Sequence, residues 1–297
     1  MGATRMVREL LLACGPMPPA IPELDGVEHS FHDLPTGVRV HLASAGPPDA
    51  PAVLALHGWP QHWWSWRHVI RELAGAFRVL CPDLRGLGWS GAPADDDFRK
   101  QRMADDQVAL LDALGLDRVR ITGHDWGGWT ALLAALTAPE RFSSVLALSI
   151  AHPWVPPLVS LRYGWKLAYQ LPLAAPFVGE EVVRDGRYVR GMLRNGRRDG
   201  GRWTPAEEEA YLAVVREPAA AHASSKLYRD FLLRDLPGSR SLAHRRFEMP
   251  ARLLIGSREP FREFAAGFRG AVEVVDGAGH FLPEEKPEAV AERIRAM

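Results

Sequence analysis

Short runs of apolar residues alternate along the chain with longer segments whose apolar positions recur every three or four residues. The short runs predict strands at 36–43, 51–56, 77–81, 118–122, 144–150, 251–255 and 271–275, and the longer segments predict helices that include 101–114, 126–138 and 284–296. Three of the strands (51–56, 144–150 and 251–255) are apolar on both faces, which is typical of strands covered by helices on both sides. The alternation favours an α/β fold with a mostly parallel central sheet flanked by helices.

Between residues 153 and 243 the pattern changes, because strand signals vanish and proline, arginine, aromatic residues and helix formers predominate. Thr204 followed by Pro205 and Glu207 predicts a capped helix start. We therefore predict a core formed by 25–152 and 244–297, a helical lid at 153–243 and an N-terminal extension at 1–24. A lid inserted between two strands would cover their carboxyl ends, where α/β sheets bind ligands. All 5 tyrosines of the protein lie in it: Tyr163, Tyr169, Tyr188, Tyr211 and Tyr228.

Composition narrows the classes of partner. The chain has 297 residues with 36 basic and 36 acidic side chains, so no nucleic-acid partner is expected. Its 2 cysteines, Cys14 and Cys81, form no disulfide framework. No apolar stretch approaches the roughly 20 residues of a membrane span, and no His, Cys and carboxylate cluster has metal-ligand spacing. We expect a cytoplasmic protein without cofactor or metal, and leave a homodimer open.

The stretch "GHDWG" at 123–127 follows a predicted strand and precedes a predicted helix. It has the form of a nucleophile elbow, a tight turn that holds one side chain above the sheet, with Asp125 as the central residue. A carboxylate is ionised at neutral pH, and its attack on saturated carbon leaves an ester that water can hydrolyse. A serine would leave an ether there, so Asp125 favours alkyl transfer by epoxide opening or halide displacement. A helix-capping aspartate is the structural alternative.

Three further stretches accompany the elbow: "HGWP" at 57–60, "LLIGSREPF" at 253–261 and "DGAGHFLPEEKPE" at 276–288. Together with "GHDWG" they resemble the α/β-hydrolase fold family, and the aspartate at the elbow resembles the branch that contains epoxide hydrolases and haloalkane dehalogenases. The resemblance spans nearly the whole chain. It implies that His280 activates water and that Glu259 orients it, although the family more often has aspartate there. Glu263 is a weaker substitute.

The resemblance also implies an oxyanion hole from the backbone N–H groups of Trp59 and Trp126. The tryptophans that follow in "HWWSWRHV" (62–69) are expected to pack the next helix. His57 and Pro60 are expected to contact the substrate beside them.

Epoxide hydrolases generally place two lid tyrosines on the epoxide oxygen. Tyr228 in "KLYRDFL" resembles the second of these. The first should lie five residues before the glutamine of "YQLP", where this chain has Trp165, so that Tyr163 or Tyr169 would have to substitute. Trp165, Tyr169 and Tyr163 are therefore expected substrate contacts, and packing in the lid is the alternative for each aromatic residue.

The sequence thus predicts a hydrolase that opens small apolar or amphipathic epoxides to vicinal diols. A haloalkane dehalogenase with the same Asp125 nucleophile is the alternative, in which the indole N–H groups of Trp126 and Trp165 would hold the halide. A ligand-binding protein that kept the fold without turnover is the third, favoured by the departures at Glu259 and Trp165 and opposed by the intact Asp125 and His280.

Overall fold

The computed structural model describes residues 19–242 and 244–297, so Cys14 and most of the predicted N-terminal extension lie outside it. In this part of the chain an 8-stranded sheet has the order β1-β2-β4-β3-β5-β6-β7-β8. The pairs β1–β2 and β2–β4 are antiparallel, and the remaining pairs are parallel. The strands are β1 (Val27–Asp33), β2 (Arg39–Ala45), β3 (Ala52–Leu56), β4 (Arg78–Pro82), β5 (Val119–His124), β6 (Phe142–Leu148), β7 (Ala251–Gly256) and β8 (Ala271–Val275).

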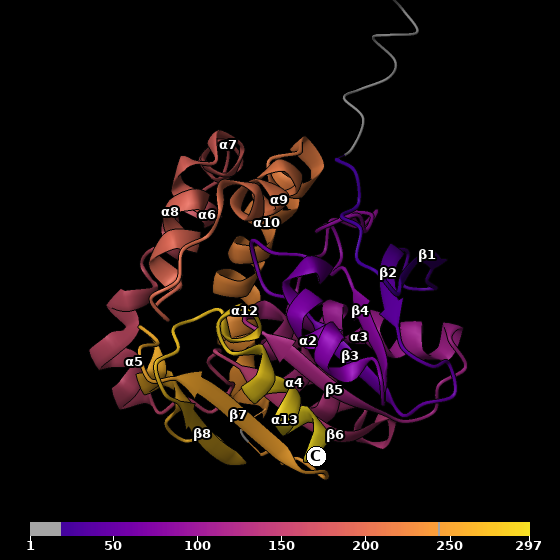
Figure 1. The fold of residues 1–297 in the computed structure, drawn as a ribbon. Helices are drawn as coiled ribbons and strands as arrows, with labels where there is room; N and C mark the ends of the chain where they lie inside the picture. The colour runs from indigo at the N-terminus through magenta and orange to yellow at the C-terminus, as the bar shows by residue number, and fades with distance from the viewer. Residues whose placement is uncertain (1–18, 243) are drawn as a thin grey trace, which may run out of the picture.

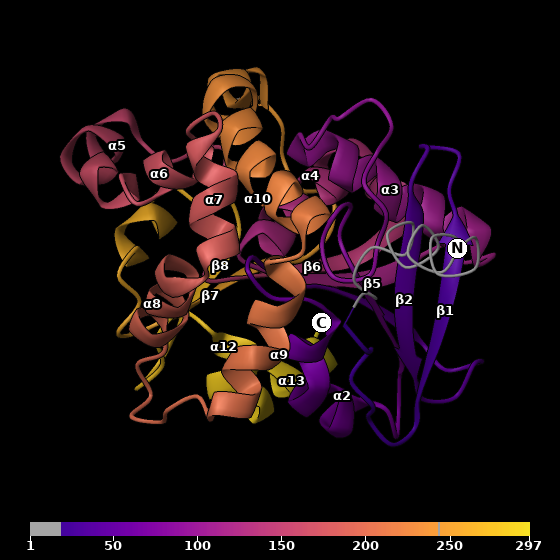
Figure 2. The same cartoon turned by 90° about the horizontal axis from the view of Figure 1, so that it is seen from above.

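Helices cover both faces of this sheet, and Figure 2 shows α3 and α4 on one face and α2, α12 and α13 on the other. One apolar cluster joins α3 and α4 to the sheet, and a second joins α2 and α13 to its opposite face. The core helices are α2 (Arg67–Leu73), α3 (Lys100–Ala113), α4 (Trp126–Thr137), α12 (Leu282–Glu285) and α13 (Pro287–Arg295), with 3₁₀ turns at Trp63–Trp66, Pro139–Arg141 and Arg262–Ala265.

The residues between β6 and β7 form helices, which we call the cap helices (Figure 1). The cap helix that begins after Thr204 has the predicted capping box. The Thr204 hydroxyl accepts from the Glu207 N–H at 3.2 Å, and the Glu207 carboxylate accepts from the Thr204 N–H at 2.8 Å. The cap helices are α5 (Pro157–Tyr163), α6 (Gln170–Ala174), α7 (Val178–Asp185), α8 (Arg187–Gly196), α9 (Pro205–Val215), α10 (Pro218–Asp230) and α11 (Leu236–Gly238), with 3₁₀ turns at Gly164–Leu167 and Ser239–Leu242 and a π-helical turn at Phe231–Asp235.

The predicted α/β fold is confirmed, and each of the predicted strands has a counterpart in the sheet. Strand β1 was missed because it lies at the sheet edge and buries neither face, so its sequence "VEHSFHD" carries no apolar alternation. The single helix predicted at 284–296 is wrong: Lys286 separates α12 from α13, because Pro287 disfavours a helical conformation at the residue before it. None of the helices in the described ranges is long and apolar enough to cross a membrane.

Candidate active site

Three of the predicted site residues follow the carboxyl ends of parallel strands. Asp125 comes directly after β5, Glu259 follows β7, and His280 follows β8. Because parallel strands end at the same edge of a sheet, the fold brings these side chains together although 155 positions separate Asp125 from His280 in sequence. The three side chains thus lie at the carboxyl end of the sheet, the edge where α/β sheets bind ligands.

Asp125 occupies a strained turn between β5 and α4. Its backbone has φ 51° and ψ −124°, in a region that residues with a side chain rarely adopt. The turn is possible because two glycines flank it: a Cβ on Gly123 would lie 2.2 Å from the carbonyl oxygen of Gly127, and a Cβ on Gly127 would lie 2.4 Å from that of His57. The glycines therefore allow the close approach that holds the Asp125 carboxylate above the sheet.

Backbone donors face the Asp125 carboxylate. The N–H of Trp59 donates to Oδ1 at 3.1 Å, and the N–H of Trp126 also stabilises the charged form. Burial raises the pKa of Asp125 nonetheless, while His280 and these two N–H groups act in the opposite direction. The same two donors could bind an oxyanion that develops on this carboxyl group.

His280 bridges the two carboxylates. Its Nδ1 lies 3.1 Å from Glu259 Oε2, and its Nε2 lies 3.7 Å from Asp125 Oδ2. Burial would lower the pKa of His280, but Glu259, Asp125 and Glu285 outweigh it and raise the pKa to about 9. The imidazole is therefore protonated in the free protein at neutral pH. Glu263, the substitute considered for Glu259, instead pairs with Lys166 at 2.9 Å.

Glu285 fixes the loop that carries His280, a role that the sequence did not predict. Its buried carboxylate accepts from the N–H groups of Gly279 at 2.7 Å and Phe281 at 2.8 Å, on either side of His280. It also accepts from the N–H of Arg198 at 3.0 Å, a residue that follows α8. Glu285 therefore stabilises the conformation of the His280 loop and links this loop to the cap. Its position five residues after His280, at the end of α12, was the available signal.

We expect Glu285→Gln to lower the free energy of unfolding by about 1–3 kcal/mol, because an amide cannot accept from all the buried N–H groups that the carboxylate serves. The pKa of His280 should also fall, since Glu285 is one of the charges that raise it. Chemical denaturation measures the first effect and NMR titration of the His280 ring the second. Glu288→Gln, at an exposed position of α13, is the matched control. An unchanged His280 pKa in the Glu285 variant would contradict the assignment.

A cavity of about 660 Å³ opens between the core and the cap helices. Asp125 and His280 lie in its wall together with residues of the cap. Its lining residues are Trp59, Pro60, Asp125, Trp165, Lys166, Tyr169, Arg187, Tyr188, Gly191, Met192, Asn195, Gly196, Arg198, Tyr228, Pro260, Phe261, His280 and Phe281. A smaller hollow of about 50 Å³ adjoins it, and Asp125, Trp126, Tyr169 and His280 are part of that wall.

Two tyrosines face each other in the large cavity. The ring centres of Tyr169 and Tyr228 are 6.5 Å apart. Burial is the main cause that raises the pKa of both hydroxyls, and nearby groups such as Asp125 raise it further. Both therefore keep their protons and can donate. Gln170 Nε2 donates to the Tyr169 hydroxyl at 3.3 Å, which leaves the O–H of Tyr169 for another acceptor. Of the two tyrosines considered for the first position, the structure brings Tyr169 to the cavity.

Trp165 lines the cavity and is 72% exposed, so the alternative that it packs in the lid is wrong. Tyr163 does not line the cavity; its ring instead lies beneath Arg162 and Lys166. The reason lies in the helix boundaries: Tyr163 ends α5, and a 3₁₀ turn over Gly164–Leu167 shifts the register before Tyr169.

His57 is a further correction. It is fully buried outside the cavity, where Nε2 accepts from the Leu84 N–H at 2.9 Å and Nδ1 lies 2.9 Å from the Gly58 carbonyl oxygen, so it cannot contact a substrate. Of the aromatic residues in the stretch 57–69, only Trp59 reaches the cavity wall. Trp63 and Trp66 are buried in the apolar cluster under α2, which agrees with the predicted packing role. Pro60 lines the cavity as expected.

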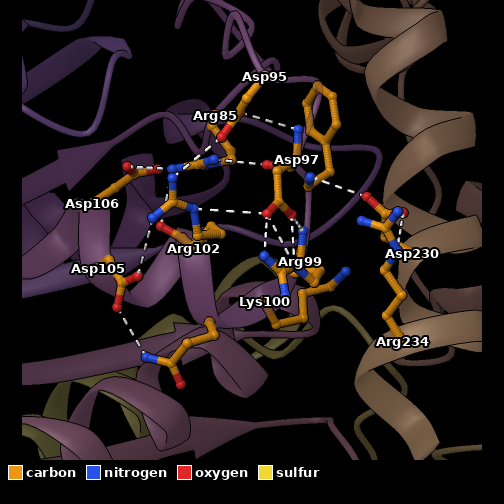
Figure 3. A network of polar contacts seen from close by, with 12 residues as sticks. Arg85, Asp95, Asp97, Arg99, Lys100, Arg102, Asp105, Asp106, Asp230 and Arg234 are labelled. Atoms are coloured by element: carbon orange, nitrogen blue, oxygen red, sulfur yellow. Dashed lines mark hydrogen bonds and ion pairs between the residues drawn. The ribbon is translucent and has the colours of Figure 1, made fainter. Parts of the chain in front are cut away.

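The helix that carries Tyr228 is anchored to the core through the loop before α3, part of a polar network shown in Figure 3. Asp230, at the end of α10, accepts from the Phe98 N–H at 3.1 Å and from Lys226 Nζ at 2.7 Å. Lys100 Nζ donates to the Leu227 carbonyl oxygen at 3.1 Å and lies 4.5 Å from the ring centre of Trp126. Core residues therefore fix the helix that brings Tyr228 to the same cavity wall as Asp125, and sequence spacing alone did not indicate Lys100.

An eight-stranded sheet of this order, with a strained aspartate after β5 and an acid–histidine pair after the last two strands, defines the class of α/β hydrolases. The chain belongs to the α/β hydrolase fold family, whose model matches residues 51–287. It is a hydrolase of the epoxide hydrolase-like group in this family.

Named relatives support this grouping. Epoxide hydrolase A of Mycobacterium tuberculosis is 30% identical over 86% of this chain and 92% of its own length. Epoxide hydrolase 4 of Mus musculus is 29% identical over 86% of this chain and 75% of its own length. The solved structure of the epoxide hydrolase CorEH without ligand superposes with a TM-score of 0.77 at 28% identity, over 90% of this chain and 96% of that one.

Proposed function

We propose that the protein hydrolyses epoxides to vicinal diols through an ester between the substrate and Asp125. The observation that carries the proposal is the pair of protonated tyrosines, Tyr169 and Tyr228, in the wall of the cavity that holds Asp125 and His280. An epoxide oxygen needs a proton donor when its ring opens, and two hydroxyls beside the attacking carboxylate supply it. The named epoxide hydrolases among the relatives support the same reaction.

In the first step an Asp125 oxygen bonds to a ring carbon, the carbon–oxygen bond of the epoxide breaks, and its oxygen takes a proton from Tyr169 or Tyr228. The product is a neutral hydroxyalkyl ester and a tyrosinate. The reaction needs no general base for Asp125, because its carboxylate is the nucleophile.

Before the second step the tyrosinate takes the proton of the His280 imidazolium, which leaves His280 neutral. Water then attacks Cγ of Asp125, and His280 Nε2 takes its proton. Glu259 stabilises the imidazolium, and the N–H groups of Trp59 and Trp126 hold the oxyanion. Collapse breaks the bond between Cγ and the diol oxygen, which takes the proton from His280. The proton on the new Asp125 carboxyl group returns to His280 and restores the starting state, so that one epoxide and one water give one diol.

Haloalkane dehalogenation is the second candidate function. One observation favours it: the indole N–H of Trp126 is buried beside Asp125 with the Tyr228 hydroxyl as a polar neighbour, and a halide could take the place of that hydroxyl. A halide leaves without a proton, however, and that reaction gives Tyr169 and Tyr228 no part.

A single-turnover reaction in heavy-oxygen water tests the proposal, with enzyme in excess over a panel of aryl and alkyl epoxides. We expect the heavy oxygen in Asp125 and not in the first diol released, because water attacks the ester carbonyl carbon. Trypsin should release residues 121–141 as one peptide that contains Asp125. Heavy oxygen in the first diol, with none in this peptide, would overturn the ester route. Halide release from bromoalkanes without diol formation from any epoxide would support the dehalogenase.

A further inference from the structure

More positive than negative side chains line the large cavity. Asp125 is its carboxylate, whereas Lys166, Arg187 and Arg198 bring positive charge from the cap. A cavity wall with excess charge of one sign raises the local concentration of ligands of the opposite sign. The distribution therefore favours an anionic ligand, provided that one of these cations is free to bind it.

Two of the three cations already have carboxylate partners. Lys166 lies 2.9 Å from Glu263, and Arg187 lies 2.7 Å from Asp185. The guanidinium of Arg198 forms no ion pair within 4.0 Å among the residues described, and its Nε donates to the Asn195 carbonyl oxygen at 3.1 Å. The exposed guanidinium of Arg198 thus keeps its remaining donors for another acceptor.

The backbone of Arg198 is nevertheless held in place. Its N–H donates to the buried Glu285 at 3.0 Å, and its carbonyl oxygen accepts from Arg258 Nη1 at 2.8 Å. Two residues earlier, the Gly196 carbonyl oxygen accepts from the His280 N–H at 2.9 Å. The segment that presents Arg198 is therefore fixed directly to the loop that carries His280, which reduces the conformational cost of binding a ligand group there.

The part of the cavity wall that α8 contributes has room for an apolar chain. Tyr188, Gly191 and Met192 of α8 line it. A Cβ built on Gly191 would meet no atom within 4 Å, so the cavity is open over this residue. A substrate could thus reach Asp125 with one end while its other end lies near Arg198.

We infer that the cavity takes epoxides whose apolar chain ends in an anionic group such as a carboxylate, and that Arg198 binds this group. The inference rests on the proposed epoxide hydrolysis and adds the substrate class. A guanidinium binds a carboxylate through two parallel hydrogen bonds, which would align the chain along α8.

Matched substrate pairs test the inference: terminal epoxides of medium-chain carboxylic acids, each compared with its methyl ester. We expect the wild type to prefer the acid in kcat/KM by about three- to five-fold, the range of a solvent-accessible ion pair, and high salt should reduce the preference. Arg198→Gln should remove the preference and Arg198→Lys should keep part of it. Arg194→Gln, on α8 but paired with Glu208, is the matched control that retains it.

A binding measurement separates this inference from the proposed reaction. Fluorescence of Trp59 and Trp165, which line the cavity, would report the Kd of the saturated acid and of its methyl ester. Tighter binding of the acid that depends on Arg198, without turnover of any epoxide, would support the anion site and contradict the proposed function. Equal kcat/KM and equal Kd for acid and ester would overturn the anion site and leave epoxide hydrolysis standing.

A second variant tests the path along α8. Gly191→Leu should fill the open space over this helix, so that kcat/KM falls for the long epoxy acids and much less for a short epoxide such as propylene oxide. An equal loss for long and short substrates would overturn the placement of the chain along α8.

Discussion

Replacing His280 by glutamine is expected to give an enzyme that accepts an epoxide and retains it as an ester. Asp125 keeps its position and its backbone donors, so the ring still opens. Water then lacks the base at Nε2, and ester hydrolysis should slow by about 10²–10⁴-fold, the usual value of a general base. Intact-protein mass spectrometry should show a stoichiometric adduct, located in the 121–141 peptide, while diol release almost stops.

His244→Gln is the matched control for this variant, because His244 is exposed and does not line the cavity. It should release diol at the wild-type rate and show no adduct. If His280→Gln protein never gains the mass of an epoxide although wild-type protein forms diol, His280 acts before the ester forms and the assigned order of steps is wrong.

In the proposed mechanism, the electrostatics of the site let His280 serve as a base only after Asp125 has reacted. In the free protein the neighbouring carboxylates hold its pKa at about 9, so the neutral base is the minor form at pH 7. Formation of the ester removes the charge of Asp125, one of the causes of the raised pKa. The pKa of His280 should therefore fall in the intermediate, and its proton passes to the tyrosinate at the stage where a base is needed.

The fold could be predicted because its main signals are local. Strands β3, β6 and β7 are buried on both faces, and their continuous apolar runs show this in the sequence. Strand β1 has no such signal, because its stability comes from hydrogen bonds to β2 and not from burial of its own side chains. The order of the strands follows from contacts between distant segments, and only the family resemblance indicated it.

The residues of the site also differ in whether the sequence near them gave a signal. Asp125 was predicted from the form of the elbow between a strand and a helix, whereas the role of His280 in its glycine-rich loop came from the family resemblance. The choice between Trp165 and Tyr169 depended on where α5 ends and how the next turn rotates the chain, which no periodicity reveals. Glu285 and Lys100 act through backbone groups of other residues, so the types of their side chains gave no sign of a role.

Replacing Tyr228 by phenylalanine is expected to slow the opening of an epoxide by about 10²–10³-fold, the cost of losing one preorganised donor at a developing oxyanion. Tyr169→Phe should have an effect of similar size, and the double variant should lose more than either. The fold should persist, because each ring keeps its aromatic contacts, those of Tyr228 with Trp59 and Trp126 included. Rapid-quench measurement of ester formation reports this step directly.

Comparison of two leaving groups makes the tyrosine prediction specific. A bromoalkane loses its halide without a proton, so any reaction with Asp125 should be nearly insensitive to loss of the two hydroxyls, whereas epoxide opening should collapse. The ratio of the two rates in wild-type and variant protein cancels general damage to the cavity. Epoxide opening that proceeds at the wild-type rate in the double variant would show that Tyr169 and Tyr228 only pack against their neighbours, and the proton would then have to come from another donor.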